Sequence, residues 1–284
     1  MKNYVTSYIK TFLFFSILAA ALLLKSGEYS AAEGSKLEGV KALDQKTDYQ
    51  YDLNGDGKVE TLRYQVTEND EKHEATLKLY IDKKLCLTKT SDGLLYRVYV
   101  LDLDANDNHL DLFIHAVLES DGVKNAFFVQ FDGKKFIHNV PFEINKLTKK
   151  YSTYRYSIEK TDGKGNFTAL LDTPIYSPAI GCYLCYVSFR MEDGEISIIP
   201  SSTYDLFKFS KEYKYKTVKA FTVYEKAGSK TAVYKVKKGD IVTFDKMYLA
   251  KSGKVYFRTI NSKGSKGWIL SDQEGLFAEQ PAWG

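Results

Sequence analysis

Apolar and polar residues alternate along most of the chain beyond residue 60, in short segments separated by clusters of Gly, Asp, Asn and Lys. A period of two is the pattern of strands that bury one face. Strands are predicted at 62–66, 75–81, 95–100, 112–117, 126–131, 136–137, 154–158, 167–171, 183–189 and 195–199. Shorter ones are predicted at 221–224, 235–236, 241–244, 254–259 and 267–270. The 22 Tyr and 17 Phe residues also favour pleated sheets. We therefore expect an all-β protein.

The pattern breaks after Pro200, where a segment rich in Ser, Lys and Tyr follows. We place a linker at 206–217 between a first domain at 48–205 and a second at 218–275. Two domains suit a chain of this length, since domains commonly have about 100–150 residues. The five short strands of the second domain predict a small closed barrel, because closure leaves few exposed strand edges.

The N-terminal segment has the features of a secretory signal. Two lysines precede an apolar run of 13 residues at 12–24, which is short against the ~20 residues of a membrane-spanning helix. Ser30 and Ala32 suit cleavage after residue 32. We expect a signal peptide at 1–32, a spacer at 33–47, and a secreted or cell-surface protein. Attachment to a membrane through an uncleaved signal is the alternative.

Charge is unevenly distributed along the chain. Removing residues 1–32 changes the formal net charge from +4 to +2, which is close to neutral. Residues 213–284 carry 14 basic and six acidic side chains, so the part that precedes them is acidic. The mixed charges do not predict nucleic-acid binding, which needs a basic excess on one face. A basic C-terminal part suits an anionic polymer instead.

A loop at 52–60 has the composition of a calcium site. Oxygen-bearing side chains occupy its first, third, fifth and ninth positions, and a glycine that permits a sharp turn occupies the sixth. Calcium takes six to eight oxygen ligands. The predicted ligands are the side chains of Asp52, Asn54, Asp56 and Glu60 and the backbone carbonyl of Lys58. The alternative is a connector built from Asx turns, without a metal.

A second loop at 102–111 begins 50 residues after the first and also leads into a strand. It has no glycine, and its last acid lies one position later than in the first loop. The predicted calcium ligands are Asp102, Asp104, Asn106 and Asp111, with Asp107 or Asn108 as substitutes. A tight polar turn in which an asparagine adopts a left-handed conformation is the alternative. The period of 50 residues predicts a repeat.

Both loops, with their flanking strands, resemble the FG-GAP/VCBS type of calcium-loop repeat of exported bacterial proteins. The first loop matches the pattern Asp-x-Asn-x-Asp-Gly-x-x-Asp/Glu, and the second resembles a glycine-free variant. The resemblance covers roughly 48–140 and extends loosely over 150–200. It implies blades of a β-propeller, of which this chain is too short to supply a full set. The expected fold is therefore a calcium-loop β-meander or a partial β-propeller.

Residues 218–275 resemble a bacterial SH3 domain. The similarity lies in the segments 237–242 and 255–258 and in the terminal Gly-Ser-Lys-Gly-Trp-Ile at 264–269. It implies an SH3-like barrel that binds a cell-wall polymer or peptide. The segment Phe221-Thr222-Val223-Tyr224 departs from the family's usual entry. Trp268 is expected in the barrel core or, with Tyr256, in an aromatic ligand-binding surface.

No catalytic motif is found, since the chain lacks a Gly-x-Ser-x-Gly elbow, a His-Glu-x-x-His pair and a phosphate-binding glycine loop. Cys182 and Cys185 fall in a predicted strand, where residues three apart face opposite sides, so buried apolar packing is expected rather than redox chemistry. The expected function is that of a non-catalytic cell-envelope binding or scaffold module with calcium as its ligand. The alternative is a hydrolase of cell-wall polymers whose carboxylates are not identified.

Overall fold

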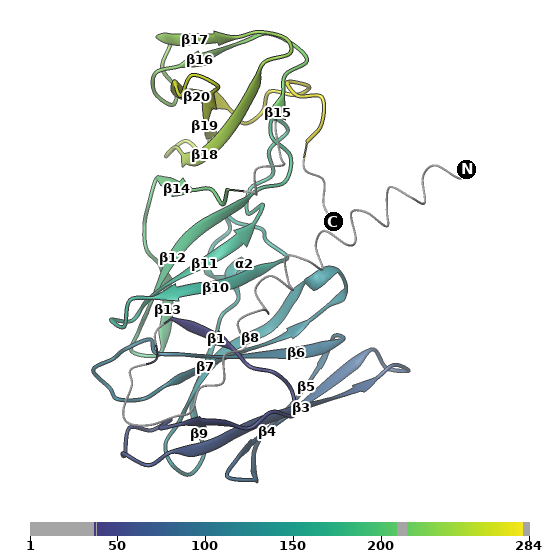
Figure 1. Ribbon diagram of the computed structural model, residues 1–284, viewed down its shortest axis with the longest axis vertical. Helices are drawn as coiled ribbons and strands as arrows, with labels where there is room; N and C mark the ends of the chain where they lie inside the picture. Colours follow the sequence, from purple (N-terminus) through teal and green to yellow (C-terminus); the bar gives the residue numbers. More distant parts are fainter. Residues whose placement is uncertain (1–36, 38, 209–214, 281–284) are drawn as a thin grey trace. The chain divides into compact units, whose positions relative to one another are not determined.

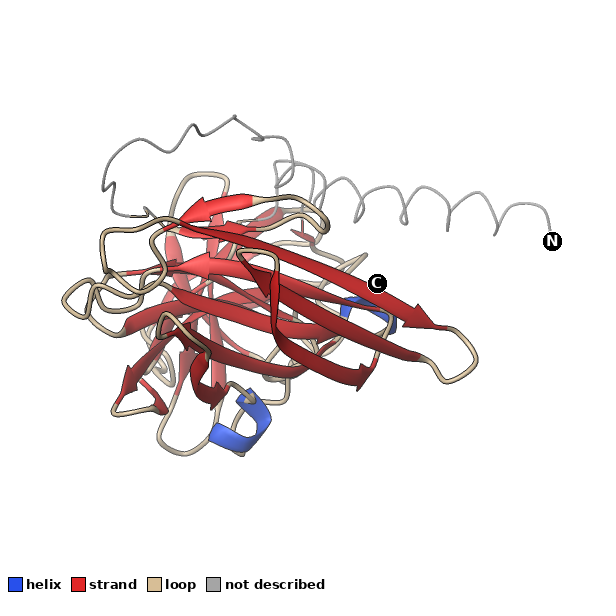
Figure 2. Ribbon diagram, turned by 90° about the horizontal axis from the view of Figure 1, so that it is seen from below, coloured by secondary structure: helices blue, strands red, loops and turns tan. Residues whose placement is uncertain are grey.

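The computed structural model describes residues 37, 39–208 and 215–280, and the predicted signal peptide lies outside these ranges. All of these described residues belong to one compact unit. Strands dominate the described part, with two short helical segments, η1 (Glu119–Asp121) and α2 (Ile144–Leu147) (Figure 2). The predicted all-β class is therefore confirmed.

Three consecutive four-stranded antiparallel meanders form most of the described chain (Figure 1). The first contains β2 (Tyr49–Tyr51), β3 (Glu60–Asn69), β4 (Glu74–Ile81) and β5 (Lys84–Asp92). The second contains β6 (Leu95–Leu101), β7 (Asp111–Val117), β8 (Val123–Phe131) and β9 (Phe136–Pro141), with β1 (Val40–Ala42) added beside β6. The third contains β10 (Tyr156–Thr161), β11 (Asn166–Asp172), β12 (Leu184–Glu192) and β13 (Glu195–Ile198).

The second meander packs between the other two. All seven residues of β7 are buried, as expected of a strand with a sheet against each face. On one side, Leu112 and Ile114 belong to a cluster with residues of the first meander. On the other side, Phe113 contacts Phe128, whose ring centroid lies 5.2 Å from that of Phe167 in β11. Burial of each such side chain contributes about 1.5–3 kcal/mol, so this packing holds the meanders together.

The C-terminal sheet contains the remaining strands, which are β14 (Thr203–Asp205), β15 (Tyr215–Lys216), β16 (Phe221–Tyr224), β17 (Ala232–Val236), β18 (Ile241–Leu249), β19 (Val255–Asn261) and β20 (Lys266–Leu270). Its order is β14-β18-β19-β20-β16-β17, and β15 also pairs with β18. The predicted closed barrel is wrong. The outer edge of β18 is occupied by β14 and β15, so β17 has no edge on which to close the sheet.

The C-terminal sheet shares a core with the third meander. The ring of Phe257 in β19 lies 5.0 Å from that of Tyr183, and the N–H of Phe207, which follows β14, donates to the carbonyl of Leu184 in β12 at 2.9 Å. Tyr215, Phe244 and Phe277 form a second aromatic group with edge-on contacts of 4.7–5.8 Å. The expected linker at 206–217 therefore contains buried residues at its two described ends.

Candidate calcium loops and an aromatic sheet face

Three loops occupy the same place in three successive meanders. Each connects the first strand to the second: 52–60 joins β2 to β3, 102–111 joins β6 to β7, and 162–165 joins β10 to β11. In each case an acid or amide residue begins the second strand, namely Glu60, Asp111 or Asn166. The three loops therefore hold the same place in the topology of their meanders.

The first loop is held by bonds from backbone amides to its acidic and amide side chains. Gly57 donates to Oδ2 of Asp52 at 3.0 Å, and Lys58 donates to Oδ1 of Asp56 at 2.8 Å. The N–H of Leu53 donates to Oε2 of Glu60 at 2.8 Å. Oδ1 of Asn54 accepts from the amide of Asp56 at 3.3 Å. Asp52 and Glu60 thus bind backbone amides across the loop, while Asn54 and Asp56 bind amides two residues ahead of them.

Electrostatics in the first loop disfavours the charged form of Glu60. Burial raises the pKa of the Glu60 carboxyl, and the charges of Asp56 and Asp52 raise it further. Oδ1 of Asp52 is buried and has no hydrogen-bond partner. A buried oxygen without a partner costs about 1–3 kcal/mol, and more when it is charged. Lys58 approaches Oδ2 of Asp56 at 3.7 Å, but its side chain is 84% exposed and compensates little.

The donor set suits calcium in its chemistry, because it consists of oxygen atoms from carboxylates, one amide and one carbonyl. Across residues 37, 39–208 and 215–280, however, no three His, Cys, Asp or Glu side chains form a group that could hold a metal ion. A calcium ion in this loop would thus depend on Asn54 and the carbonyl of Lys58 as well as on the carboxylates. The buried oxygen of Asp52 is the feature that a cation would satisfy.

The second loop repeats the bonding of the first. The N–H of Leu103 donates to Oδ2 of Asp111 at 3.1 Å, as Leu53 does to Glu60. The backbone N–H of His109 donates to Oδ1 of Asp107 at 2.8 Å, as the backbone N–H of Lys58 does to Oδ1 of Asp56. By this pattern Asp107 corresponds to Asp56.

The remaining predicted ligands of the second loop are also near one another. Oδ1 of Asp104 accepts from the backbone amide of Asn106 at 3.1 Å and from its side chain at 2.9 Å. Asn106 thus presents a donor to Asp104. Oδ1 of Asp102 is buried. Burial raises the pKa of Asp111 to about 7, and the charges of Asp107 and Asp102 contribute.

The third loop shows how such a turn closes without a cation. Oδ1 of Asp162 accepts from the amides of Lys164 and Asn166 at 2.9 and 3.1 Å, and Oδ2 accepts from the Asn166 side chain at 2.7 Å. Both carboxylate oxygens are satisfied within the loop. The first loop differs because one oxygen of its leading aspartate is left without a donor.

The predicted ligand-binding aromatics lie on one face of the C-terminal sheet. Trp268 and Tyr256 are partly exposed, and Tyr248, which the sequence did not single out, contacts both at centroid distances of 6.0 and 6.2 Å. The expectation that Trp268 belongs to the core is wrong. Buried Gly267 and Ile269 take the inward positions of β20, so the side chain between them points outward. The three rings are tilted by 54–71° and do not form one flat platform.

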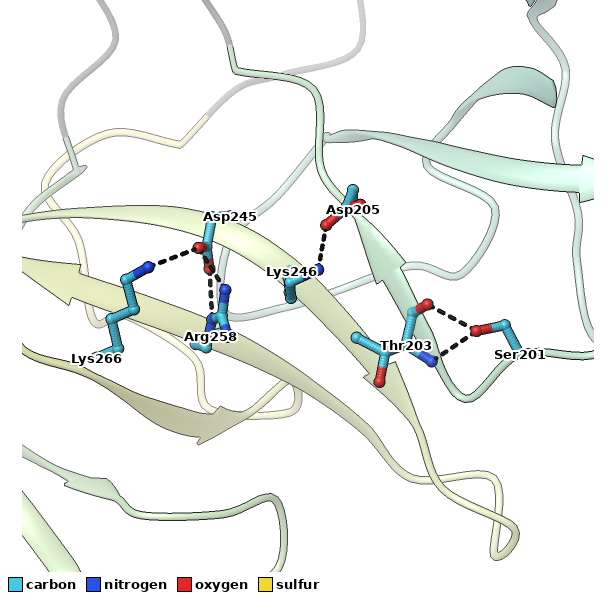
Figure 3. A network of polar contacts seen from close by, with 7 residues as sticks. All are labelled: Ser201, Thr203, Asp205, Asp245, Lys246, Arg258 and Lys266. Carbon is cyan, nitrogen blue, oxygen red and sulfur yellow. Dashed lines mark hydrogen bonds and ion pairs between the residues drawn. The ribbon is translucent and has the colours of Figure 1, made fainter.

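Paired charges lie beside this aromatic face, and Figure 3 shows the charged side chains without the aromatic rings. Arg258 directs two nitrogens at the Asp245 carboxylate, at 2.8 and 2.6 Å, and lies 5.9 Å from the Trp268 ring. Lys266 approaches Asp245 at 3.8 Å, and Lys246 pairs with Asp205 of β14. The face therefore presents aromatic rings beside cations that are partly neutralised.

The other candidates from the sequence are structural. Cys86, Cys182 and Cys185 are free thiols, and Cys182 and Cys185 are buried as expected. Burial raises the pKa of both.

A surface hollow at the β3–β4 hairpin is lined by polar side chains, namely Thr67, Glu68, Asn69, Asp70, Glu71, Thr76 and Lys78. It lacks the apolar lining usual for small-molecule sites.

Comparison with protein families, curated proteins and solved structures found no match. None of the helices in the described part of the chain has the length and apolar character needed to cross a membrane.

Proposed function

We propose that this chain is an exported calcium-binding β protein that acts as a cell-envelope binding or scaffold module without catalysis. The observation that carries the calcium assignment is the contrast between an aspartate of the first loop and an aspartate of the third. Asp52 has a buried oxygen without a hydrogen-bond partner, whereas both oxygens of Asp162 accept hydrogen bonds within their loop. A cation in the first loop would satisfy that oxygen and offset the repulsion among Asp52, Asp56 and Glu60.

The test compares thermal melts of the full chain in millimolar calcium and in chelator. A ligand at 100 times its Kd adds ~2.7 kcal/mol to the free energy of unfolding if it binds only the folded state. Calcium should therefore raise Tm by several degrees. Asp52→Asn should reduce this difference, and Asp162→Asn, the matched change in the third loop, should retain it. Superimposable melts of the unchanged chain would refute calcium binding.

Envelope binding is supported by a separate feature, the partly exposed aromatic face around Trp268 on the basic C-terminal sheet. Long-range attraction to an anionic wall polymer is screened beyond about 8 Å at physiological salt. The full chain should sediment with purified cell walls at low salt, and less of it should do so at high salt. Trp268→Ala and Tyr256→Ala should weaken binding, whereas Tyr176→Ala, at a residue 66% exposed elsewhere, should not. If the chain does not sediment with cell walls at low salt, envelope binding is refuted.

A further inference from the structure

The three equivalent loops contact one another in sequence order through one repeated hydrogen bond. The N–H of Leu110 in the second loop donates to the carbonyl of Leu53 in the first at 3.0 Å. The N–H of Gly165 in the third donates to the carbonyl of Leu103 in the second at 2.7 Å. Leu53 and Leu103 hold the same position, immediately after the leading aspartate. The first and second loops therefore each accept a bond from the next loop at an equivalent carbonyl.

The contact between the first two loops is tight enough to require glycine. Gly55 has φ +68°, and a Cβ built on it would lie 2.3 Å from the carbonyl oxygen of Asn108 and 2.5 Å from its Cβ. Real Cβ atoms essentially never approach other atoms so closely. Gly57, in the same loop and at φ +83°, has no atom within 4 Å of the equivalent position. The first loop is thus seated on the second at Gly55, and Gly57 is free of this contact.

The second and third loops are joined by further bonds. Ala105 donates to the carbonyl of Gly163 at 3.0 Å, and the hydroxyl of Thr161 donates to the carbonyl of Asp102 at 2.9 Å. A close-packed contact of this kind shifts as a unit rather than deforming gradually. Displacing one loop therefore requires its neighbour to move.

We propose that the loops 52–60 and 102–111 order as one unit, so that a divalent cation held by the first loop also stabilises the second. The stabilisation extends through Leu103 to the turn at 162–165. This inference rests on the calcium binding proposed above, but the contact between the loops exists without the metal. Coupling between sites commonly changes affinity or protection about 5–150-fold.

The test measures amide hydrogen exchange in the full chain, with and without calcium. Asp107→Asn is introduced first, because it weakens the second loop's own ability to hold a cation. Calcium should then slow exchange of the Leu110 and Gly165 amides at least about fivefold through the first loop alone. Adding Gly55→Ala should remove this slowing. Adding Gly194→Ala should retain it, since this variant carries a similar backbone strain at φ +76° in the β12–β13 turn, with no atom within 4 Å and outside the three loops.

Failure of the coupling is distinguishable from failure of calcium binding. If calcium slows exchange at Gly57 and Lys58 but not at Leu110, the cation binds and the coupling is refuted. If calcium changes the exchange rate of no amide, calcium binding is refuted. The coupling between the loops is then tested in the metal-free protein. There Gly55→Ala should speed exchange of Leu110 at least about fivefold more than Gly57→Ala; equal rates would overturn the inference. If Gly55→Ala does not fold, Asn108→Gly, which keeps the φ of +59° accessible, replaces it and should reduce the slowing.

Discussion

The N–H of Leu53 donates to Oε2 of Glu60 at 2.8 Å, so the residue that follows the first predicted ligand binds the last one. This bond closes the first loop at the point where β3 begins. It also holds a carboxylate in a buried position, beside the charges of Asp52 and Asp56. The loop is therefore closed at an electrostatic cost, and that cost has measurable consequences.

Glu60→Gln should separate the structural role of this side chain from its charge. The amide oxygen of Gln can still accept from Leu53. Because the folded state raises the pKa of Glu60, its charged form disfavours folding above the unfolded-state pKa. The metal-free variant should therefore be at least as stable as the unchanged protein at pH 7, while its stabilisation by calcium should fall. Urea unfolding of both proteins, without metal and with calcium, measures these stabilities. A large loss of metal-free stability in Glu60→Gln would contradict the prediction.

His115 should make stability depend on pH. Its ring stacks on Tyr99 at a centroid distance of 5.9 Å, and burial lowers its pKa from 6.5 to about 4, with a smaller contribution from Arg97. The unfolded chain therefore binds a proton more readily than the folded one. The contribution of neutral His115 to the free energy of unfolding is fully present above pH 6.5. It is lost as pH falls toward 4, and the loss is roughly 3 kcal/mol in all.

Comparison of two variants isolates this effect of His115. His115→Phe should flatten the dependence of unfolding free energy on pH between 6.5 and 4, whatever its effect on absolute stability. His138→Asn, at an exposed position with φ +53°, serves as the control for removal of a histidine that is not buried. Parallel pH profiles for the unchanged protein and His115→Phe would count against a neutral buried imidazole.

Arg258 should contribute more to stability than Lys246, although both pair with an aspartate. Arg258 binds Asp245 with two nitrogens, and the side chains are 22% and 14% exposed. The Asp205 partner of Lys246 is 66% exposed. Arg258→Met should cost about 1–3 kcal/mol, and Lys246→Met less than about 1 kcal/mol. Chemical denaturation measures both, and equal losses would show that the bidentate pair has no special weight.

Cys185→Ser should destabilise the third meander. The thiol of Cys185 is fully buried in the core of β12, so a hydroxyl there would be desolvated, at a cost of about 1–3 kcal/mol. Cys86→Ser, on the partly exposed edge strand β5, should change the unfolding free energy by less than about 0.5 kcal/mol. Similar midpoints in urea for the two variants would argue against this account.

Periodicity located most strands but missed those that depend on a partner. The predicted segments at 95–100, 112–117 and 221–224 match β6, β7 and β16 closely. Strand β5 was not predicted, because its apolar residues are few and its exposed positions carry Thr and Lys; pairing with β4 makes it a strand. The same holds for β14, a three-residue strand that forms by pairing with β18.

For the candidate site, the spacing of acidic and amide residues identified the two loops. Which residue of one loop corresponds to which residue of the other could be seen only from the hydrogen bonds of the structure. Asp107 takes the place of Asp56, whereas spacing from Asp102 favoured Asn106, because an extra residue precedes Asp111. The loop at 162–165 follows the same topology; the resemblance extended only loosely over 150–200, and no ligands were predicted in this loop. Tyr248 was also missed, since it joins Tyr256 and Trp268 only across neighbouring strands.

By itself, the sequence determined the all-β class, the predicted strands that the structure retains, and the two acidic loops. These follow from local properties: alternation of side chains along a strand, and the turn chemistry of Gly, Asp and Asn. Only the tertiary structure decided that the C-terminal sheet stays open, that Trp268 points outward, and that the loops contact one another at Gly55 and Asn108. Each of these depends on which strand edges and backbone groups meet across long sequence separations, and pairing of that kind leaves no periodic signal in the chain.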